Sequence, residues 1–288
     1  MHIFGVAREI WRRRRRVRAL QFLLSAGSAP RAWQYWRYVC ATTLATWPDS
    51  LRFALTQKAF RPYLRRRFSS AKKVAIIDAH YRLLDARLPR DFAEFYTWPG
   101  LRIGSVAGKS GRNYEFFLEL LQGKEGEFDV FLMDDETRSG LAMMASVLAN
   151  EDGKTVLYIG GLRGIKPPHG KAEIVAATRD LHGLRPKAAV FHATCQIAAL
   201  FGAEKVIAPT LDNHITRWAG GESRTIHADY DGFWREYNPQ QRADGDYSIP
   251  ITLPYRDPAT VKRHKRAEWA RRKAMVEDLN KQIRERIG

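Results

Sequence analysis

Cysteine is almost absent from this chain of 288 residues, which has only Cys40 and Cys195. Two cysteines cannot form the framework of disulfides that stabilises small secreted domains. The sequence therefore fits a reducing compartment, and we expect a cytoplasmic protein. At this length a chain can bury a large core, so we expect one main globular domain with extensions at its ends.

Several common catalytic motifs are also missing. The chain has no P-loop, no G-x-S-x-G nucleophile turn and no G-x-G-x-x-G turn, which excludes the enzyme classes built on them. It has eight histidines but neither paired cysteines nor an H-E-x-x-H pattern, so we predict no metal site. His192 and Cys195 lie three residues apart, but no carboxylate follows at helical spacing to orient the histidine. We predict that this pair packs in the core.

Long apolar runs are missing near the start of the chain. The run 19–24 is short and is interrupted by Gln21, although it follows the arginines 12–16 and precedes small residues at 25–29. This order loosely resembles a secretory signal, but the apolar run is too short for a signal or for a membrane-spanning helix. We expect neither a cleaved signal nor a spanning helix.

Acidic residues are scarce at both ends of the chain. Residues 1–73 contain 17 Lys and Arg against 2 Asp and Glu, a net charge of +15, and residues 257–288 contain 10 against 5, a net charge of +5. Because the whole chain carries +17, residues 74–256 carry −3. We therefore expect both ends to meet an anionic partner and the middle to be an ordinary folded body.

The first third of the chain has a helical hydrophobic period. Apolar residues at spacings of three and four predict one amphipathic helix whose other faces are very basic. Its apolar stripe consists of Ile3, Val6, Ile10, Val17, Leu20 and Leu24. Such a helix fits an anionic membrane surface or, less well, nucleic acid; the alternative is a docked helix with solvated arginines. Two further stripes predict buried helical faces: Trp33, Trp36, Cys40, Leu44 and Trp47, then Val74, Ile77, Tyr81, Leu84 and Leu88.

From Leu101 the pattern changes to short apolar runs separated by glycine and asparagine turns. We predict four or five strands in an antiparallel meander, with the runs 101–107, 114–121, 127–133, 141–148 and 155–162. A short helix at 172–180 and a longer one from Pro186 to a stop at Gly202 follow. A strand at 206–208, a brief helix capped by Asp212 or Asn213, a strand at 247–251 and a charged helix from about 258 to 287 complete the prediction.

Five stretches of the chain resemble the VirK/YbjX family of proteobacteria. They are 125–127, 157–164, 181–187, 229–234 and the basic tail with Lys262, Arg263, Lys265 and Arg266. The resemblance extends from about Tyr81 to the end, and we expect the first seventy residues to lie largely outside it. It implies a role in virulence, the Gram-negative cell envelope, lipopolysaccharide remodelling and tolerance of cationic antimicrobial peptides. It implies no agreed biochemical activity.

The predicted order of elements is similar to that of the GNAT-type acyltransferases. We therefore expect an α+β fold with a mixed, mostly antiparallel sheet, flanking helices and a GNAT-like core. In that superfamily the backbone at a helix start holds the pyrophosphate of coenzyme A or another acyl-carrier thioester. The resemblance implies a phosphate cradle at Gly183, Leu184, Arg185 and Lys187. It also implies that Gly160 and Gly161 mark a distorted strand that positions the thioester carbonyl.

Carboxylates and a histidine near these segments are candidates for a general base. Glu125 and Glu127 are two residues apart, so we expect them to share one face of a strand, and Asp229 and Asp231 repeat this arrangement. His182 precedes the cradle. The catalytic candidates are therefore Glu127, His182 and Asp231. The structural alternative is that Glu127 faces solvent and that the two aspartates close a turn.

These features predict three regions: a basic, mostly helical region 1–95, a GNAT-like core 96–256 and a basic helix 257–288. The hypothesis for function is an acyl-carrier-dependent acyltransferase that acts on an amine or hydroxyl of an envelope component. The rival is a non-catalytic adaptor at an anionic membrane surface, attached through the N-terminal arginines. Nucleic-acid binding is a third hypothesis, because the charge fits but no helix-turn-helix or RNP-like pattern is present.

Overall fold

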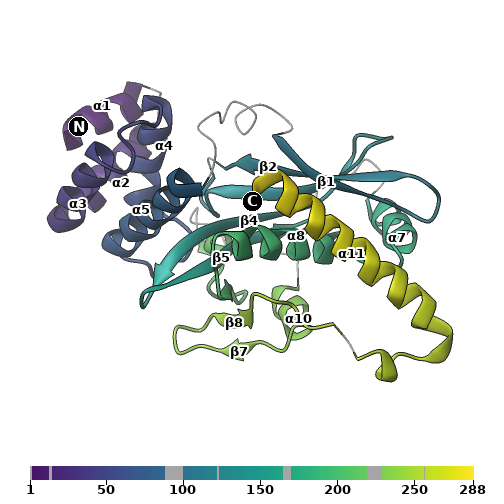
Figure 1. Cartoon of the computed structure of the whole chain (residues 1–288). Coiled ribbons are helices and arrows are strands. Elements are labelled where there is room, and N and C mark those ends of the chain that lie inside the picture. The colour runs from purple at the N-terminus through teal and green to yellow at the C-terminus, as the bar shows by residue number, and fades with distance from the viewer. Residues whose placement is uncertain are drawn as a thin grey trace.

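A computed structural model describes residues 2–12, 15–87, 100–121, 123–164, 170–218, 229–255 and 257–288. The described chain forms a mostly antiparallel sheet with helices packed on it and a cluster of N-terminal helices at one end (Figure 1). This is the mixed α+β architecture that the sequence predicts. A single connected set of buried apolar side chains runs from Val6 to Ile287, so the N-terminal helices share the core of the sheet.

The chain begins with helices. Their bounds are α1 (Ile3–Arg12), α2 (Arg16–Gly27), α3 (Pro30–Ala41), α4 (Asp49–Ala59) and α5 (Ser70–Arg87). The single amphipathic helix predicted for residues 3–24 is wrong, because α1 ends at Arg12 and α2 begins at Arg16. In α2 the buried residues are Ala19, Phe22 and Ala26, and the predicted apolar stripe of that segment is exposed instead.

The meander predicted from residue 101 onward is confirmed. Five antiparallel strands follow one another: β1 (Leu101–Ala107), β2 (Asn113–Leu120), β3 (Phe128–Asp134), β4 (Gly140–Glu151) and β5 (Lys154–Arg163). The helices α7 (Lys171–Asp180) and α8 (Pro186–Leu200) come next, and β6 (Lys205–Ala208) then pairs in parallel with β5. This is the order expected of a GNAT-like core.

The remaining elements extend the sheet and then cover it. The helices α9 (Ile215–Trp218) and α10 (Tyr230–Arg235) precede β7 (Gln240–Gln241) and β8 (Tyr247–Pro250), and the strand order in the described sheet is β1-β2-β3-β4-β5-β6-β8-β7. The last helix, α11 (Arg266–Ile287), starts later than predicted because residues 258–265 contain two short 3-10 turns.

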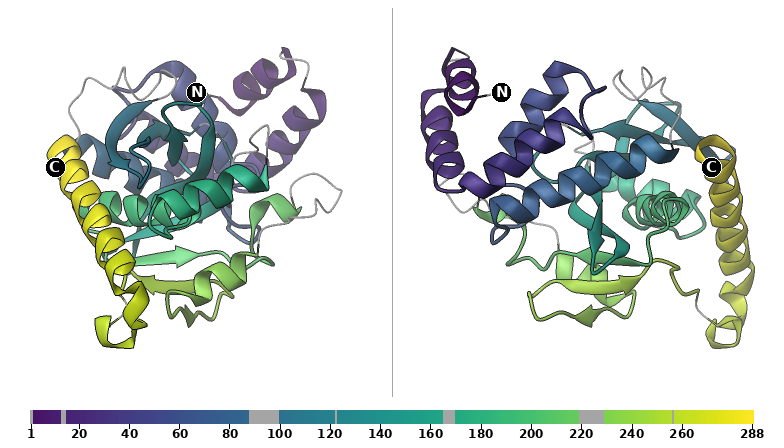
Figure 2. Two further views of the ribbon diagram at one scale, coloured as in Figure 1. Left: turned by 90° about the vertical axis from the view of Figure 1, so that its right-hand side faces the viewer. Right: turned by 60° about the vertical axis from the view of Figure 1, so that its left-hand side comes forward.

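Two helices cover the same face of the sheet. The buried side of α8 packs on β3 and β4, while α11 lies across β1 and α8 (Figures 1 and 2). Close packing is visible at Gly104, where a Cβ atom would lie 2.8 Å from a methyl carbon of Leu279. The opposite face carries a small separate cluster of Phe117, Phe131 and Met133. This arrangement leaves the start of α8 and the end of β5 at one edge of the core.

Candidate functional site

A pocket of about 670 Å³ lies where α7, the start of α8 and the end of β5 meet. Much of its wall is apolar, with Leu141, Ile174, Val175 and Phe233 among the lining side chains. A pocket of this size with a mainly apolar wall is typical of sites for small organic ligands.

Four cationic side chains line the same pocket, and no acidic side chain does. They are Lys171 and Arg179 of α7, and Arg185 and Lys187 around the first turn of α8. Arg185 forms an exposed ion pair with Glu236 and lies over the ring of Phe233. Burial, with repulsion from Arg185 as a second cause, lowers the pKa of Lys187. Within the described ranges the other three cations have no carboxylate partner.

Only some of the residues predicted to form a phosphate cradle have groups free for a ligand at the first turn of α8. Pro186 opens the helix, as the sequence predicts, and Arg185 is the capping residue. The amides of Gly183 and Leu184, however, donate to the carbonyls of Thr178 and Leu181 at 2.9 Å each. We therefore remove Gly183 and Leu184 from the cradle, because a tight turn already uses their donors. Arg185 and Lys187 stay in it.

His182 belongs to the same turn but points elsewhere. Both His182 and Gly183 have positive φ values, 53° and 78°. Burial lowers the pKa of His182, and the cations Lys109 and Arg271 lower it further. Lys109 lies in the β1–β2 turn and Arg271 lies in α11. His182 does not line the pocket. The structure therefore does not bring this candidate base to the cradle.

The distortion predicted in β5 is present. The register between β4 and β5 shifts at Ala145 and Ser146, so Gly160 is the extra residue of a bulge. A Cβ atom on Gly160 would lie 1.6 Å from the carbonyl oxygen of Glu125, and one on Gly161 would lie 2.7 Å from the carboxylate of Glu125. Both glycines are therefore needed so that the turn before β3 can lie against the strand.

The turn places the Glu125 carboxylate beside the bulge. Glu125 accepts a hydrogen bond from Thr216 at 2.5 Å and forms an ion pair with Arg163. Arg163 immediately precedes Gly164, which lines the cationic pocket. The carboxylate is 6% exposed. Glu125 is thus a fixed, nearly enclosed carboxylate, and its ion-pair partner Arg163 is the chain neighbour of a residue that lines the pocket.

A second buried carboxylate, Asp129 of β3, lies near Glu125. Burial raises the pKa of Asp129 to about 7, and the neighbouring Glu119 and Glu125 raise it while Arg163 lowers it. One carboxylate oxygen of Asp129 has no hydrogen-bond partner in the described structure. The sequence places Asp129 on a strand face but gives no sign of this environment, because the neighbours come from three separate segments.

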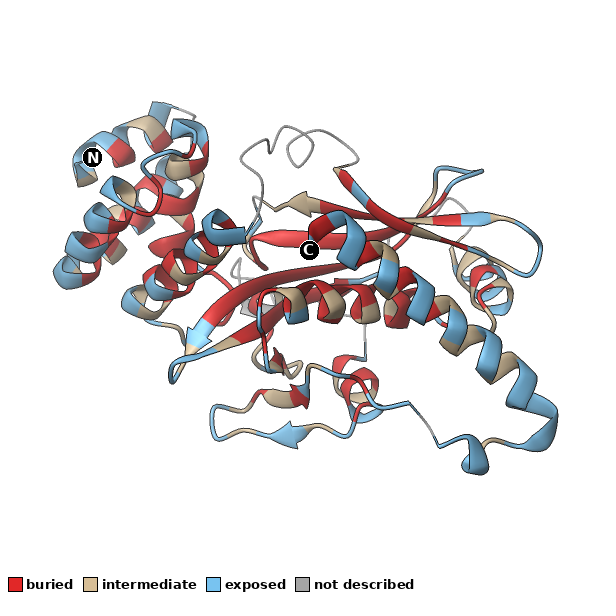
Figure 3. Cartoon of the chain, viewed as in Figure 1, coloured by how far each residue is buried: buried red, intermediate tan, exposed pale blue. Residues whose placement is uncertain are grey.

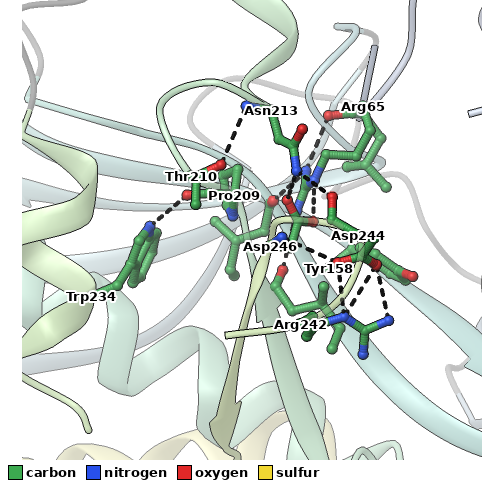
Figure 4. Close-up of polar contacts among 12 residues, drawn as sticks. Arg65, Tyr158, Pro209, Thr210, Asn213, Trp234, Arg242, Asp244 and Asp246 are labelled. Atoms are coloured by element: carbon green, nitrogen blue, oxygen red, sulfur yellow. Dashed lines mark hydrogen bonds and ion pairs between the residues drawn. The ribbon is translucent and has the colours of Figure 1, made fainter. Parts of the chain in front are cut away.

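Side chains of the protein itself bridge β5 and β6 beyond their parallel pairing. The parallel pairing of β5 and β6 covers only Val156–Tyr158 and Lys205–Ile207. Beyond it, the Arg65 guanidinium donates to the carbonyls of Ile159 at 2.9 Å and Ile207 at 3.3 Å. Arg65 also forms an ion pair with Asp246 at 2.5 Å (Figure 4).

Further along β5, the hydroxyl of Tyr230 forms hydrogen bonds with the backbone of Leu162. It accepts from the amide of Leu162 at 2.8 Å and donates to the carbonyl of Leu162 at 3.1 Å. A carrier chain cannot pair with β5 as an added strand while these groups are in use. The bulge is therefore confirmed, but its role in positioning a thioester carbonyl stays a prediction.

Glu127 has a structural environment. It is fully buried, forms an ion pair with Lys58 at 2.9 Å and accepts a hydrogen bond from Tyr81 at 3.1 Å. Glu127 precedes β3, so the prediction that it shares a strand face with Glu125 is wrong. It is buried, so the alternative that it faces solvent is wrong as well. We do not keep it as a catalytic candidate, because a fully enclosed carboxylate cannot reach a substrate.

The two aspartates at 229 and 231 lie at the start of α10. Asp229 caps the helix by accepting from the Gly232 amide at 2.8 Å. Asp231 lines a different pocket, of about 550 Å³, together with Arg67 and Arg235. Glu127, His182 and Asp231 thus lie in three different environments and do not form one site.

The remaining sequence candidates are structural. Cys195 is buried in α8, and burial raises the pKa of its thiol. Burial lowers the pKa of His192 to about 4. In the described ranges, no group of three or more His, Cys, Asp or Glu side chains is placed to hold a metal ion. None of the described helices is both long and apolar enough to cross a bilayer.

The fold and the pocket define a mixed α+β protein with a GNAT-like order of elements and a pocket whose wall is cationic and partly apolar. The chain belongs to the family described as "Protein of unknown function (DUF535)", whose model matches residues 10–285. An uncharacterized protein of Escherichia coli K12, YbjX, is 30% identical over 275 residues, which cover 91% of this chain and 81% of the relative. The resemblance to the VirK/YbjX family is therefore confirmed.

The family match corrects one expectation. It begins at residue 10, so most of the N-terminal helical region lies inside the family and not outside it. Because α1 to α5 share one core with the sheet, their inclusion agrees with the packing. The N-terminal region must therefore be part of any account of function.

Similar solved structures are distant. A cAMP-binding acyltransferase from Mycobacterium smegmatis and a mutant of it are each 10% identical to this chain, with TM-scores of 0.30 and 0.31. This chain spans 62% and 65% of their lengths. Scores this low carry no argument about fold or activity, so the fold assignment rests on the observed strand order.

Proposed function

We propose that this protein binds an acyl-carrier thioester in the pocket at the start of α8 and transfers the acyl group to an amine or hydroxyl. One observation carries the proposal: a pocket with apolar walls is lined by four cations and by no carboxylate. Such a pocket matches a ligand that is anionic at one end and apolar at the other. Coenzyme A thioesters and phosphopantetheine thioesters have this chemistry.

The phosphates of the donor would lie at Arg185 and Lys187. Arg185 offers a planar fork that can bind a phosphate with two hydrogen bonds, and Lys187 offers a point charge. The first-turn amides of Lys187 and Ala188 have no acceptor inside the helix, and they would add donors for the same anion. Ile174 and Val175 of α7 would contact the apolar part of the donor.

Glu125 is the proposed general base. The acceptor attacks the thioester carbonyl, a new C–N or C–O bond forms, the C–S bond breaks, and the thiolate leaves. Glu125 takes the proton of the acceptor and passes it to the departing sulfur. Arg163 and Thr216 hold the carboxylate in one orientation, which is what a positioned base needs.

Calorimetry tests the binding step. Titration with coenzyme A, a long-chain acyl-coenzyme A and an acyl-carrier protein thioester should show the tightest binding for an acylated donor. Arg185→Ala should weaken it by about one to two orders of magnitude, because a charge-assisted bond contributes about 1.5–3 kcal/mol. Lys187→Ala should weaken it less.

A matched control is Lys154→Ala, which removes an exposed ion pair with Glu204 far along β5 from the pocket. It should leave donor binding unchanged. No binding of any donor by the wild type, or equal binding by Arg185→Ala, contradicts the proposal.

Release of free thiol tests the transfer step. With a bound donor and an amine or hydroxyl acceptor, Glu125→Gln should slow thiol release by about 10²–10⁴-fold while donor affinity stays the same. Glu204→Gln is the matched control, because Glu204 is exposed and immediately precedes β6, away from the pocket. Donor binding without thiol release by the wild type would reduce the protein to a carrier-binding protein.

The family context suggests that the acceptor is a component of the cell envelope. This part of the proposal rests on the resemblance to the VirK/YbjX family, with a role in envelope maintenance, virulence and tolerance of cationic peptides. Loss of the protein should lower the inhibitory concentration of a cationic peptide or change the lipid A mass spectrum of its host. If both stay unchanged, the envelope role is wrong although the transferase can still be right.

A further inference from the structure

The first two helices expose large apolar side chains to solvent. On α1, Phe4 is 78% and Trp11 53% exposed; on α2, Val17 is 70%, Leu20 57% and Leu24 66% exposed. Within each helix these positions are separated by three, four or seven residues, so they lie on one side. Each helix therefore has an outer apolar stripe in addition to the inner one that enters the core.

The two outer stripes meet at the junction of the helices. The Arg16 guanidinium lies 5.4 Å from the centre of the Trp11 ring, which puts the end of the α1 stripe beside the start of the α2 stripe at Val17. The inner residues Val6 and Phe22 are buried and account for packing against the rest of the protein. We name the outer surface formed by Phe4, Trp11, Val17, Leu20 and Leu24 the α1–α2 face.

Unpaired arginines surround this face. They are Arg8, Arg12, Arg15, Arg16 and Arg18, all exposed. No carboxylate in the described ranges forms an ion pair with any of them, and the first 48 residues of the chain contain only one acidic residue, Glu9. Charge of one sign is therefore concentrated around exposed aliphatic and aromatic side chains.

We infer that the α1–α2 face binds the surface of an anionic lipid bilayer. A bilayer interface accepts both parts of the face, because its headgroup charge attracts the arginines and its acyl boundary takes up the apolar side chains. Nucleic acid would use the arginines but would gain little from Val17, Leu20 and Leu24, which have no ring to stack on a base. The combination favours lipid.

The position of the face allows binding without blocking the pocket. The N-terminal helices stand at one end of the molecule, while α7 lies at the other end of the sheet (Figures 1 and 3). A protein attached through the α1–α2 face would keep the start of α8 open. This inference does not depend on the proposed function, because it rests on different residues.

Vesicle sedimentation with the full chain tests the inference. The wild type should pellet with phosphatidylglycerol vesicles at low salt, and binding to phosphatidylcholine vesicles should be weaker by at least about tenfold. Replacing Arg12, Arg15, Arg16 and Arg18 with Gln should lower the affinity for phosphatidylglycerol vesicles by at least about tenfold. The matched control replaces Lys262, Arg263, Arg271 and Arg284 with Gln, which removes the same charge from the C-terminal region and should change little.

A second variant separates lipid from nucleic acid. Replacing Val17, Leu20 and Leu24 with Ser keeps every charge and should still weaken vesicle binding by at least about tenfold. Circular dichroism and thermal unfolding should show that both variants stay folded, because all the replaced side chains are exposed. Wild-type binding to neutral vesicles as tight as to anionic ones overturns the inference, and so does full binding by the serine variant. Tight binding of a DNA or RNA duplex by the wild type and the serine variant alike, with no vesicle binding, would assign the face to nucleic acid instead.

Discussion

Two groups of basic side chains lie near the central strands, and the protein uses them in opposite ways. Arg65 is 3% exposed, and its guanidinium is held by a carboxylate and by two strand carbonyls. The cations at the start of α8 line an open pocket that has no acidic side chain. Arg65 holds β5 and β6 together, and the Asp246 carboxylate matches its charge. Of the four cations that line the pocket, only Arg185 has a carboxylate partner in the described structure, the exposed Glu236, and the other three leave their charge unmatched.

The two groups also differ in what they leave accessible. Arg65 bridges the carbonyls of Ile159 in β5 and Ile207 in β6, and Tyr230 bonds the backbone of Leu162 further along β5. The pocket at the start of α8 stays open and is lined by cations.

The largest expected effect is on the free energy of unfolding, at the buried ion pair of Arg65 and Asp246. Arg65→Met should lower the free energy of unfolding by about 3–5 kcal/mol, because Asp246 would stay buried without its ion-pair partner. Urea unfolding followed by circular dichroism measures it. The double variant Arg65→Met with Asp246→Leu should recover much of the loss. A loss below about 1 kcal/mol would mean that Arg65 does not hold the strands.

A smaller effect concerns pH and the buried Asp129. Its pKa is about 7 in the folded protein and about 4 in an unfolded chain. Between these values the folded state still binds a proton that the unfolded state has released, so stability should fall as pH rises from about 4 to about 7. The total loss is on the order of 2–4 kcal/mol.

The Asp129→Asn variant tests this directly. It should remove that pH dependence and should be more stable than the wild type at pH 8. Unfolding curves at several pH values measure both. If wild type and variant keep the same difference in stability from pH 4 to pH 8, Asp129 does not titrate in this range.

The smallest expected effect on the free energy of unfolding is at the exposed cations of α7 that line the pocket. Lys171→Ala and Arg179→Ala should change the free energy of unfolding by less than about 0.5 kcal/mol, because both side chains are exposed and have no carboxylate partner in the described structure. Each should nevertheless weaken donor binding. A large loss of stability in either variant would place these cations with Arg65 and remove the contrast between the two groups.

Local pattern predicted much of the fold. Glycine turns and short apolar runs defined β1 to β5, and Pro186 marked the first residue of α8. What the sequence could not provide were contacts between distant segments. The closure by Arg65 joins residues 65, 159, 207 and 246, and nothing local marks it.

The site was predictable in part for the same reason. Arg185 and Lys187 follow from a basic pair around a helix-opening proline, and the structure places both on a pocket wall. The cations of α7 and the buried Asp129 could not be found, because they depend on how α7 and β3 pack. The outer stripe of α2 was misplaced because periodicity identifies a stripe but not whether it faces the core or solvent.

Amide hydrogen exchange with and without a long-chain acyl-coenzyme A tests the central claim most directly. The account predicts added protection in α7 and in the first turn of α8, residues 171–189, and unchanged exchange in β5 and β6. Protection that appears along β5 and β6 while 171–189 stays unchanged would show that the donor displaces Arg65 and binds between the strands. That result would contradict the assignment of the open cations at α8 as the ligand site.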